Sequence, residues 1–372
     1  MSALVVLLPA RSFGGHERML IEWLGRAKAR HGLQVEVHGA GNEHLVRACE
    51  AAGLGAPRAS YPRHGNPVGD FLVTWRLLGR VAPQLPVLFA PNVVQALPLQ
   101  WLAAFLRRRR VVGYVPMAYP ASLMGYRAGA LRDWIARRIA RRVDMWITIS
   151  GEQQQLLLER WNAPPPVFVV PNSLTLADSG AGEAAAPAGG VLRVLYAGRF
   201  DPNQKGLDWL CARLRARRER WMGRLRFTFQ GDGRFAEELL RLSHELGEEH
   251  VRVRGWGDVR AAMAEADVVL LPSRFEGVPL VALEATHYGL PVVATRGAGV
   301  GAFAAPACLF EFGDDEAMLA ALLALREPSR RAAALAHARS RLRQSVCPTS
   351  FRREIERVTA ALRRMSAAPF LR

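Results

Sequence analysis

The stretch Val268-Val-Leu-Leu-Pro-Ser-Arg-Phe-Glu-Gly-Val-Pro-Leu-Val-Ala-Leu-Glu284 runs from an apolar segment through a loop into a helical pattern. Its first four residues predict a buried strand, and Pro279 suits the first turn of the helix that follows. A strand followed directly by a helix is the repeating unit of parallel sheets that are covered on both faces. The same stretch places two carboxylates, Glu276 and Glu284, in a mostly apolar setting, which raises the question of what they bind.

The strand-then-helix pattern recurs along the chain. Five apolar runs predict the strands of a first sheet: Leu4–Leu8, Val35–His38, Val87–Ala90, Val111–Val115 and Met145–Ile149. Five more runs predict a second sheet: Leu192–Ala197, Leu225–Gln230, Val251–Arg254, Val268–Leu271 and Pro291–Ala294. The sequence therefore predicts an α/β protein with two doubly wound, Rossmann-like domains.

Composition and periodicity predict the domain boundaries. Residues 177–190 are rich in glycine and other small residues that cannot build a core, so they predict a linker. Near the C-terminal end, Phe351, Ile355, Val358 and Leu362 recur at helical spacing and predict an amphipathic helix that docks on a folded domain. We expect an N-terminal domain over 1–173, a linker over 174–190, a second domain over 191–350 and a terminal helix over 351–372, for which the N-terminal domain is a candidate partner.

The overall composition limits the class of protein. A length of 372 residues favours two domains, and a hydrophobic content of 50% excludes a disordered chain. The formal net charge of +17 predicts attraction to polyanions such as nucleic acid, anionic lipid or phosphorylated substrates. The cysteines are too widely spaced for a metal site or a secreted disulfide framework, so we expect them to be reduced in a cytosol: Cys49, Cys211, Cys308 and Cys347. The apolar run Leu4–Leu8 ends too early for a signal peptide or a membrane span.

Ligands of open parallel sheets bind beyond the carboxyl ends of the strands, where loops enter helix N-termini. The loop 11–17 carries the pair Gly14-Gly15, which either lets the backbone approach a phosphate or sugar or simply makes a tight turn. The loop after the strand Leu192–Ala197 carries Arg199 and Lys205. Two cations at a helix start suit a diphosphate, and the alternative is that both are solvated surface cations.

The third candidate loop contains the two carboxylates of the opening stretch. A carboxylate accepts hydrogen bonds from two adjacent hydroxyls, so Glu276 and Glu284 could hold two separate diols with an anion between them over the helix N-terminus. A nucleotide sugar, with its sugar, diphosphate and ribose, has this layout. The alternative is a helix-start glutamate stabilised by the helix dipole and an unrelated surface glutamate. Because the helix is largely apolar and buried glutamates are rare without a partner, we favour the ligand interpretation.

With these motifs in place, the sequence resembles the family 4 retaining glycosyltransferases, whose GT-B fold has two Rossmann-like domains facing across a cleft. Two glutamates separated by seven residues, within Leu271–Thr295, are similar to the signature of that family. Further segments resemble the family in the same order along the chain: Phe13–Glu17, Val170–Ser173, Ala197–Phe200 with Lys205-Gly206, Gln230–Gly233 and Arg254–Asp258. The likeness is specific in the C-terminal half and looser in the first domain.

The resemblance implies retaining transfer of a sugar from a UDP- or GDP-type nucleotide sugar to a hydroxyl acceptor, in a lipid-linked or cell-envelope glycan. It implies no metal or other cofactor. Glu276 would hold hydroxyls of the donor sugar, Glu284 the ribose diol, and Arg199 with Lys205 the departing diphosphate. The resemblance assigns the remaining donor contacts to Gly15, Gly198, Gly231, Trp256, Gly277, Val278, Pro279 and Leu280.

One departure from the family concerns the acceptor side. Many members carry a histidine after the fourth or fifth strand of the first domain, but the corresponding stretch, residues 113–120, contains none. His16, Tyr114 and Tyr119 are the candidates for a residue that faces the acceptor.

Much of the positive charge lies in two segments of the first domain, residues 107–110 and 131–146. In the second segment the apolar residues at helical spacing are Leu131, Trp134, Ile135, Ile139 and Val143. Such a basic amphipathic helix suits an anionic membrane surface. The alternative is that its apolar face packs on the domain's own sheet while the arginines are solvated. On the first interpretation the protein is cytoplasmic and peripheral on the inner face of the cytoplasmic membrane.

Other classes of protein are less consistent with the sequence. A nucleic-acid-binding protein would match the charge, but no reader motif is recognisable, so we expect no nucleic acid partner. A dinucleotide-dependent dehydrogenase is disfavoured because Gly14-Gly15 lacks the three-glycine fingerprint. A nucleotide-sugar epimerase of the same fold stays open as an alternative, whereas a phosphorylase would need a lysine-bound cofactor for which no site is recognisable.

Overall fold

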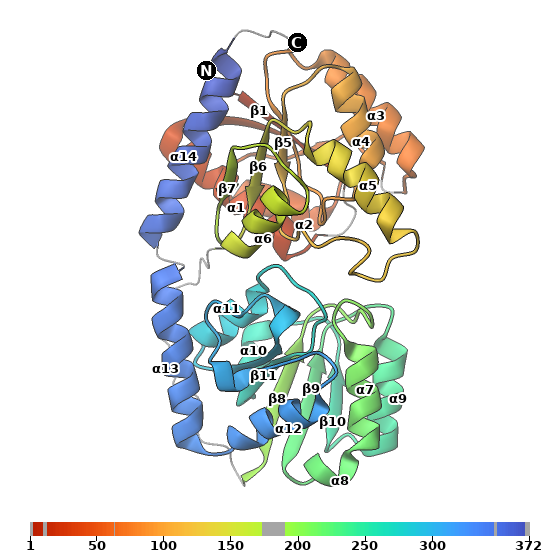
Figure 1. Ribbon diagram of the computed structural model, residues 1–372, viewed down its shortest axis with the longest axis vertical. Coiled ribbons are helices and arrows are strands. Elements are labelled where there is room, and N and C mark those ends of the chain that lie inside the picture. Colours follow the sequence, from red (N-terminus) through yellow and green to blue (C-terminus); the bar gives the residue numbers. More distant parts are fainter. Residues whose placement is uncertain (1–2, 10–12, 63, 173–189, 346–347, 369–372) are drawn as a thin grey trace. The chain divides into compact units, whose positions relative to one another are not determined.

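The computed structural model describes residues 3–9, 13–62, 64–172, 190–345 and 348–368. The chain forms two compact units (Figure 1). The first unit comprises residues 1–173 and 348–372, and the second comprises residues 174–347. The linker predicted over 174–190 lies outside the described residues except for Gly190.

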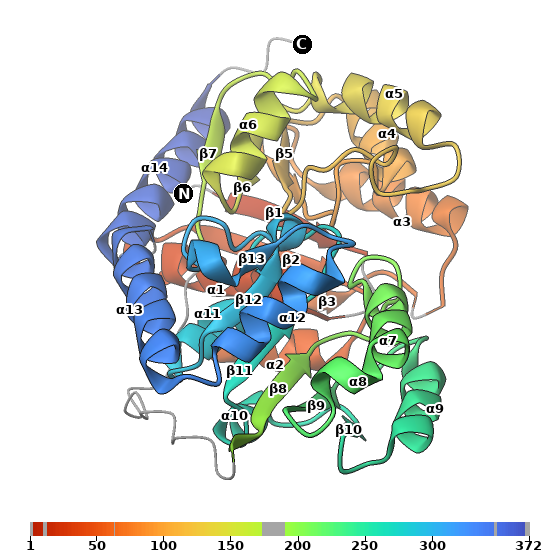
Figure 2. The same ribbon diagram turned by 60° about the horizontal axis from the view of Figure 1, so that its bottom comes forward.

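The first unit is built on a seven-stranded parallel sheet of order β3-β2-β1-β4-β5-β6-β7. Its strands are β1 (Ala3–Leu8), β2 (Gln34–Gly39), β3 (Arg58–Ala59), β4 (Val87–Phe89), β5 (Val111–Tyr114), β6 (Met145–Thr148) and β7 (Val167–Val169). Its helices are α1 (Gly15–His31), α2 (Glu43–Ala51), α3 (Pro67–Arg80), α4 (Pro98–Leu106), α5 (Gly129–Ala140), α6 (Gly151–Glu159) and α14 (Pro348–Ala367). The helix α14 packs against α1 and β7, while Figures 1 and 2 both show α3, α4 and α5 side by side.

The second unit is built on a six-stranded parallel sheet of order β10-β9-β8-β11-β12-β13. Its strands are β8 (Leu192–Ala197), β9 (Leu225–Gln230), β10 (Val251–Arg254), β11 (Val268–Leu271), β12 (Val292–Thr295) and β13 (Leu309–Phe310). Its helices are α7 (Leu207–Ala216), α8 (Arg218–Trp221), α9 (Ala236–Leu246), α10 (Val259–Ala264), α11 (Leu280–His287), α12 (Asp315–Ala324) and α13 (Pro328–Ser345).

The predicted fold class is confirmed, because both sheets are parallel and flanked by helices. Each of the ten predicted strands is present, with ends that differ by one residue at most. The sequence analysis missed β3, β7 and β13, which have only two or three residues each. The two-residue strands β3 and β13 carry too few residues to show a pattern, whereas β7 lies in the apolar run Val167–Val170, which the sequence analysis did not identify as a strand.

Several large aromatic side chains in the cores of the two units have paired polar atoms. In the first unit Trp101, Trp146 and Trp161 are fully buried, and each indole N–H donates to a backbone carbonyl. In the second unit Trp221 packs edge-on against Phe227. Burying the ring while pairing its N–H avoids the cost of an unsatisfied donor.

The helix α5 differs from the sequence prediction. It ends at Ala140, so Val143 is not part of it, and Leu131, Trp134 and Ile135 are exposed instead of packing on the sheet. The buried side of the helix carries Asp133 in their place. The proposal that the apolar face of this segment packs internally is therefore wrong for these three residues.

The polar contacts of Asp133 explain this rotation of α5. Its Oδ1 atom accepts hydrogen bonds from the Ala121 backbone N at 2.7 Å and from Gln95 Nε2 at 3.0 Å. Its Oδ2 atom accepts from the Ser122 backbone N at 3.1 Å and from the Ser122 hydroxyl at 2.6 Å. Burial raises the pKa of Asp133, but these hydrogen bonds lower it overall. Four donors inside the fold hold this carboxylate inward, and the apolar residues beside it consequently face outward.

Candidate active site

The candidate site of the second unit lies where the strand order reverses. β8 and β11 are neighbours, with β9 and β10 continuing on one side and β12 and β13 on the other. At such a switch point the loops that leave the two strands diverge and form a crevice beyond their carboxyl ends. Here those loops are residues 198–206, which lead into α7, and residues 272–279, which lead into α11.

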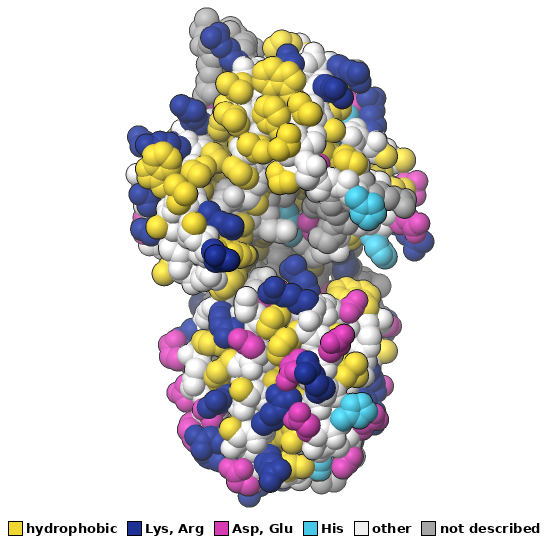
Figure 3. Space-filling model, turned by 90° about the vertical axis from the view of Figure 1, so that its right-hand side faces the viewer, with side chains coloured by type: hydrophobic (Ala, Val, Ile, Leu, Met, Phe, Trp, Pro, Cys, Tyr) yellow, Lys and Arg dark blue, Asp and Glu magenta, His cyan; other side chains and the backbone are white. Residues whose placement is uncertain are grey.

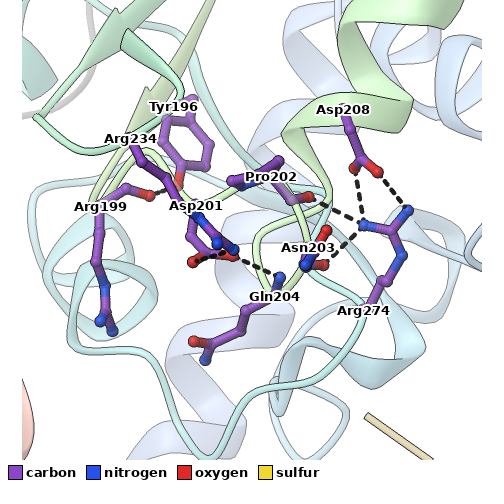
Figure 4. A network of polar contacts seen from close by, with 9 residues as sticks. All are labelled: Tyr196, Arg199, Asp201, Pro202, Asn203, Gln204, Asp208, Arg234 and Arg274. Carbon is purple, nitrogen blue, oxygen red and sulfur yellow. Dashed lines mark hydrogen bonds and ion pairs between the residues drawn. The ribbon is translucent and has the colours of Figure 1, made fainter. Parts of the chain in front are cut away.

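The loop 198–206 is held in shape by its own polar contacts. Asp201 Oδ1 accepts a hydrogen bond from the Gln204 backbone N at 2.8 Å, which closes a tight turn. Arg234 Nη2 lies 3.1 Å from Asp201 Oδ2. The hydroxyl of Tyr196, at the end of β8, donates to the Arg199 carbonyl at 2.7 Å (Figure 4). The conformation of this loop is therefore set by the protein before any ligand arrives.

Tyr196 keeps its proton at any physiological pH. Burial raises its pKa well above the usual value, and the nearby Glu276 carboxylate raises it further. The hydroxyl thus stays a hydrogen-bond donor toward the loop.

Arg274 joins the two loops. Its Nη1 atom donates to the Pro202 carbonyl at 3.0 Å, to the Asn203 carbonyl at 2.7 Å and to Asp208 Oδ1 at 2.8 Å. Its Nη2 atom donates to Asp208 Oδ2 at 2.9 Å, which completes a bidentate pair (Figure 4). A planar guanidinium presents several donors in a fixed fork, so one side chain fixes the loop 198–206 and the start of α7 together.

Lys205 and Glu276 form the centre of the site. Lys205 Nζ is paired directly with Glu276 Oε1, which also accepts from the Ser273 hydroxyl at 3.1 Å. Gln204 Nε2 lies 3.4 Å from Glu276 Oε2. Glu276 is 8% exposed, and its charge is matched by the ammonium group of Lys205. The structure brings together a cation from the β8 loop and a carboxylate from the β11 loop, as the sequence analysis expected of a shared site.

Two glycines allow the loops at this edge of the sheet to approach one another closely: Gly206 meets the loop after β11, and Gly231, which follows β9, meets the loop after β8. A Cβ on Gly206, whose φ is +66°, would lie 2.1 Å from the Pro272 carbonyl oxygen. A Cβ on Gly231, whose φ is +153°, would lie 1.8 Å from the Gly198 carbonyl oxygen. Both contacts are far inside the van der Waals limit, so no other residue fits without moving the backbone.

Apart from Gly15, which begins α1 in the first unit, the other predicted donor residues lie on segments that follow strands of the second sheet. Arg199 is exposed on the loop after β8, and Glu284 is half-buried on α11. Gly277, Val278, Pro279 and Leu280 connect Glu276 to α11, which begins at Leu280 with Pro279 as its N-cap, one position earlier than the first-turn placement we predicted. Trp256, which follows β10, is 74% exposed.

In the first unit, His16 and Tyr114 come together at the carboxyl ends of β1 and β5. Their rings stack with centroids 5.2 Å apart and planes 8° apart. Neither ring nitrogen of His16 has a hydrogen-bond partner among the described residues, although Nδ1 lies 3.4 Å from Glu17 Oε1. Glu17 Oε2 accepts from the Gly14 backbone N at 2.9 Å and so caps α1, which begins at Gly15.

The electrostatics of this cluster follow from its burial. Burial by itself raises the pKa of Glu17, but the interactions with His16 and with backbone N–H groups lower it overall. Tyr114 is 1% exposed, and burial together with the Glu17 charge raises its pKa. Tyr114 therefore stays protonated, and its ring stacks on the ring of His16. Tyr119 is placed differently, since its hydroxyl donates to Glu152 Oε1 of α6 at 2.5 Å.

The sequence analysis missed Gln204, Ser273 and Arg274, all of which contact the centre of the site or its loops. Arg274 is only two residues from Glu276 in the sequence, but nothing in the sequence distinguished it from the many other arginines of this basic chain. The composition does single out Lys205, because the 50 basic residues include only two lysines, Lys28 and Lys205. A lysine is therefore a rare residue type in this chain, and one of the two lies at the centre of the candidate site.

Two further features of the described residues bear on the kind of site. No three His, Cys, Asp or Glu side chains gather closely enough there to hold a metal ion. None of the helices in the described ranges combines the length and apolar character that crossing a bilayer requires.

Two doubly wound units with a switch-point site define the architecture of GT-B glycosyltransferases, and comparisons with known proteins agree. A glycosyl transferase 4-like domain model matches residues 14–173, and a glycosyl transferases group 1 model matches residues 192–327. The chain belongs to the family 4-like glycosyltransferases of the GT-B fold, as its motifs indicated.

Individual relatives match shorter stretches. An uncharacterized 41.2 kDa protein in the cps region of Klebsiella pneumoniae is 35% identical over 108 residues, which is 28% of each chain. Glycogen synthase of Thermus thermophilus is 42% identical over 109 residues, 28% of this chain and 24% of that one. The chain thus spans about a quarter of the length of these curated relatives. The crystal structure of Anabaena Alr3699/HepE in complex with UDP-glucose has a TM-score of 0.73 at 17% identity, over 97% of this chain and all of that one.

Proposed function

We propose that the protein transfers a hexosyl unit from a nucleotide diphosphate sugar to a hydroxyl acceptor, with retention of the anomeric configuration and without a metal ion. The observation that carries this proposal is the Lys205–Glu276 pair, supported by Ser273, at the carboxyl ends of β8 and β11. Membership of the glycosyltransferase family supports it, as does the likeness in fold to a protein that was crystallised with UDP-glucose.

The donor would bind by exchanging partners with this ion pair. Lys205 would turn from the carboxylate to the diphosphate, and Glu276 would accept hydrogen bonds from hydroxyls of the donor sugar. Both charges would stay partnered throughout, which avoids the cost of an isolated buried charge. Arg199 would add a second cation to the diphosphate, and Glu284 would accept from the ribose hydroxyls. A UDP- or GDP-type donor fits this set of groups.

The transfer step needs charge stabilisation more than a protein nucleophile. In retaining transfer the acceptor oxygen bonds to the anomeric carbon on the face from which the diphosphate leaves, and the acceptor proton passes to the leaving phosphate oxygen. Negative charge develops on that oxygen as the bond breaks. Lys205, Arg199 and the N-terminal end of α11 are the groups that would stabilise this charge.

The acceptor side rests on fewer observations. His16 has two ring nitrogens without a hydrogen-bond partner among the described residues and is held flat by Tyr114, so it could bind a sugar hydroxyl at the edge of the first sheet. We propose a lipid-linked or cell-envelope glycan as the acceptor class, in line with the similarity to a protein from a cps region. A cytoplasmic enzyme that works at the inner face of the membrane fits that acceptor.

The test is a thermal-shift screen of nucleotide sugars and nucleoside diphosphates, followed by an assay of diphosphate release. A ligand that binds the native state raises the melting temperature by mass action. We expect one nucleotide sugar to stabilise the protein and to release its diphosphate only when an acceptor is present. Release that needs no acceptor, together with a change in the sugar, would indicate the epimerase. An inverted anomeric product, seen by NMR, would contradict the retaining mechanism.

A further inference from the structure

One face of the first unit is both apolar and strongly basic. Of the twelve large hydrophobic side chains that are exposed in the described chain, nine lie between Val68 and Ile135. Residues 67–146 contain twelve arginines but only three aspartates, Asp70, Asp133 and Asp144. Two of these aspartates are buried, and Asp144 accepts a hydrogen bond from the Val111 backbone N at 2.8 Å. Residues 67–146 therefore carry a large excess of positive charge.

The apolar part of this surface is formed by α4, α5 and the loop that leads into α5. We call it the α4–α5 face, and its residues are Leu102, Leu106, Leu123, Tyr126, Leu131, Trp134 and Ile135. Leu123 is 74% exposed, Leu131 58% and Trp134 53%. On the first unit, Figure 3 shows hydrophobic side chains gathered together with Lys and Arg side chains around them. The hydrogen bonds of Asp133 hold α5 in this rotation, so the exposure is built into the fold.

Arginines are stacked on the exposed aromatic rings of this face. The guanidinium of Arg138 lies 3.4 Å from the centroid of Trp134, and that of Arg132 lies 5.5 Å from the centroid of Tyr126. Such pairs place an apolar ring and a cation next to each other on the surface. This combination suits the boundary between hydrocarbon and lipid headgroups, where aromatic and basic side chains both gather.

A pocket lined by arginines lies at the C-terminal ends of α4 and α5. It has a volume of about 460 Å³ and is lined by Phe105, Arg108, Arg109, Arg141 and Arg142. Arg109 is only 6% exposed; its Nη2 atom donates to the Leu78 carbonyl, while Nε and Nη1 have no hydrogen-bond partner among the described residues. Buried guanidinium nitrogens without an acceptor are costly unless an anion completes them.

The backbone at Arg108 adds to this argument. Arg108 follows the C-cap of α4 and has a φ of +50°, a position where helices usually place glycine. An arginine there is strained relative to glycine, and strain of this kind often marks a position kept for its side chain.

We propose that the α4–α5 face docks on an anionic lipid bilayer, with a headgroup phosphate in the arginine pocket and the apolar side chains inserted at the interface. A nucleic acid would match the charge but would gain nothing from the exposed leucines and the isoleucine. A second copy of this chain would bring two positive surfaces together. An anionic bilayer complements both the charge and the apolar character.

The apolar contribution is tested by flotation of the full-length protein with phosphatidylcholine vesicles, with and without phosphatidylglycerol, at low and moderate salt. We expect flotation only with the anionic vesicles. The double variant L131S/I135S should bind about tenfold more weakly at moderate salt, because apolar area no longer enters the interface. Leu240→Ser on α9 is the matched control, since Leu240 is 47% exposed in the second unit. If L131S/I135S binds like the wild type at both salt concentrations, insertion is ruled out.

The arginine pocket is tested by two variants of equal charge. R141Q/R142Q should bind anionic vesicles about thirtyfold more weakly, because each basic residue near the surface contributes about fivefold. R224Q/R252Q removes the same charge from exposed positions of the second unit and should bind nearly like the wild type. Arg108→Gly gives a third variant that relieves backbone strain, so weaker binding with an unchanged melting temperature would separate recognition from folding.

Three outcomes would overturn the proposal. An equal loss in R141Q/R142Q and R224Q/R252Q would show only diffuse attraction. Displacement from vesicles by soluble glycerol phosphate would show that the pocket takes small anions from solution. Saturable binding of duplex DNA through the same arginines, without vesicle binding, would assign the face to nucleic acid. None of these measurements reads out glycosyl transfer, so their failure leaves the proposed reaction untouched.

Discussion

The two units differ in how their basic side chains are balanced by acidic ones. In the second unit many cations are paired with carboxylates, among them Arg193 with Asp267, Lys205 with Glu276, Arg217 with Asp315 and Arg274 with Asp208. In the region of the first unit from α3 to β6, twelve arginines share three aspartates, two of them buried. Figure 3 shows the same contrast, since acidic and basic side chains alternate over the second unit while basic side chains surround an apolar area on the first.

This difference separates two uses of positive charge. Paired charges hold loops in one conformation and lose little energy to solvent, so they position a site. A surface region whose sequence holds many more basic than acidic residues creates an outward field that attracts an external anion. Much of the excess charge of the sequence thus lies in one region of the first unit, whereas Lys205 of the candidate active site is held by an ion pair inside the second unit.

The largest expected effect comes from breaking the central pair of the second unit. Lys205→Ala should lower turnover by about a hundredfold to a thousandfold, the usual cost of removing one preorganised group that stabilises developing charge. Steady-state assays with the donor found in the ligand screen would measure it, with circular dichroism to show that the fold is retained. Lys28→Ala, at the other lysine, is the control and should keep full activity, since Lys28 donates only to the Gly53 carbonyl on the surface. An active Lys205→Ala enzyme would remove the basis of the proposed site.

A second large effect should follow from the one buried acid that orients α5. Asp133→Ala leaves four donors without their acceptor and should destabilise the first unit by about 3 kcal/mol. Urea or thermal unfolding measures the change, and Asp70→Asn, at another buried aspartate of the same region, is a comparison for burial alone. A stability equal to that of the wild type would mean that Asp133 does not set the rotation of α5.

The same aspartate predicts how stability depends on pH. The folded pKa of Asp133 lies below its unfolded value, so its contribution is complete above about pH 4 and is lost as the pH falls through the folded pKa. Wild-type stability should therefore decline on acidification more steeply than that of Asp133→Asn, which does not titrate. Parallel pH profiles for the two proteins would contradict this assignment.

A smaller effect is expected at the arginine that joins the two loops. Arg274→Lys keeps the charge but loses the bidentate pair with Asp208 and the simultaneous contacts with two carbonyls. Because Arg274 positions the loop that carries Lys205, we expect kcat to fall about tenfold, in line with the loss of a charge-assisted hydrogen bond, with a smaller change in the KM for the donor. Full activity in Arg274→Lys would show that the charge alone suffices.

The smallest effect should come from the acceptor side. His16→Ala should raise the KM for the acceptor several-fold and leave donor binding unchanged, because one neutral hydrogen bond contributes about 1 kcal/mol. His16→Gln, which can still donate and accept, should recover part of the loss. Donor affinity measured by thermal shift distinguishes this result from a general defect, and reduced donor affinity in His16→Ala would instead place the histidine on the donor side.

Much of the fold and part of the site could be predicted from the sequence. The ten predicted strands were visible because short apolar or alternating runs, each followed by a loop and a helical pattern, leave few alternatives in a parallel sheet. The proximity of Lys205 and Glu276 was also predictable, since both follow strands whose carboxyl ends must meet at one edge. These features depend on local pattern and on the topology that the pattern enforces.

Other features depended on contacts between residues far apart in the chain, and only the tertiary structure decided them. The rotation of α5 follows from Gln95, Ala121 and Ser122, which meet Asp133 across the fold, so helical periodicity alone could not decide which of the apolar residues of α5 are exposed. The stacking of His16 on Tyr114 and the reach of Arg274 to Asp208 depend likewise on where separate elements end in space. Hydrophobic pattern identifies which segments are buried, but a single buried charge with its hydrogen-bond donors decides which way a helix turns, because leaving it unpaired would cost more than exposing three apolar side chains.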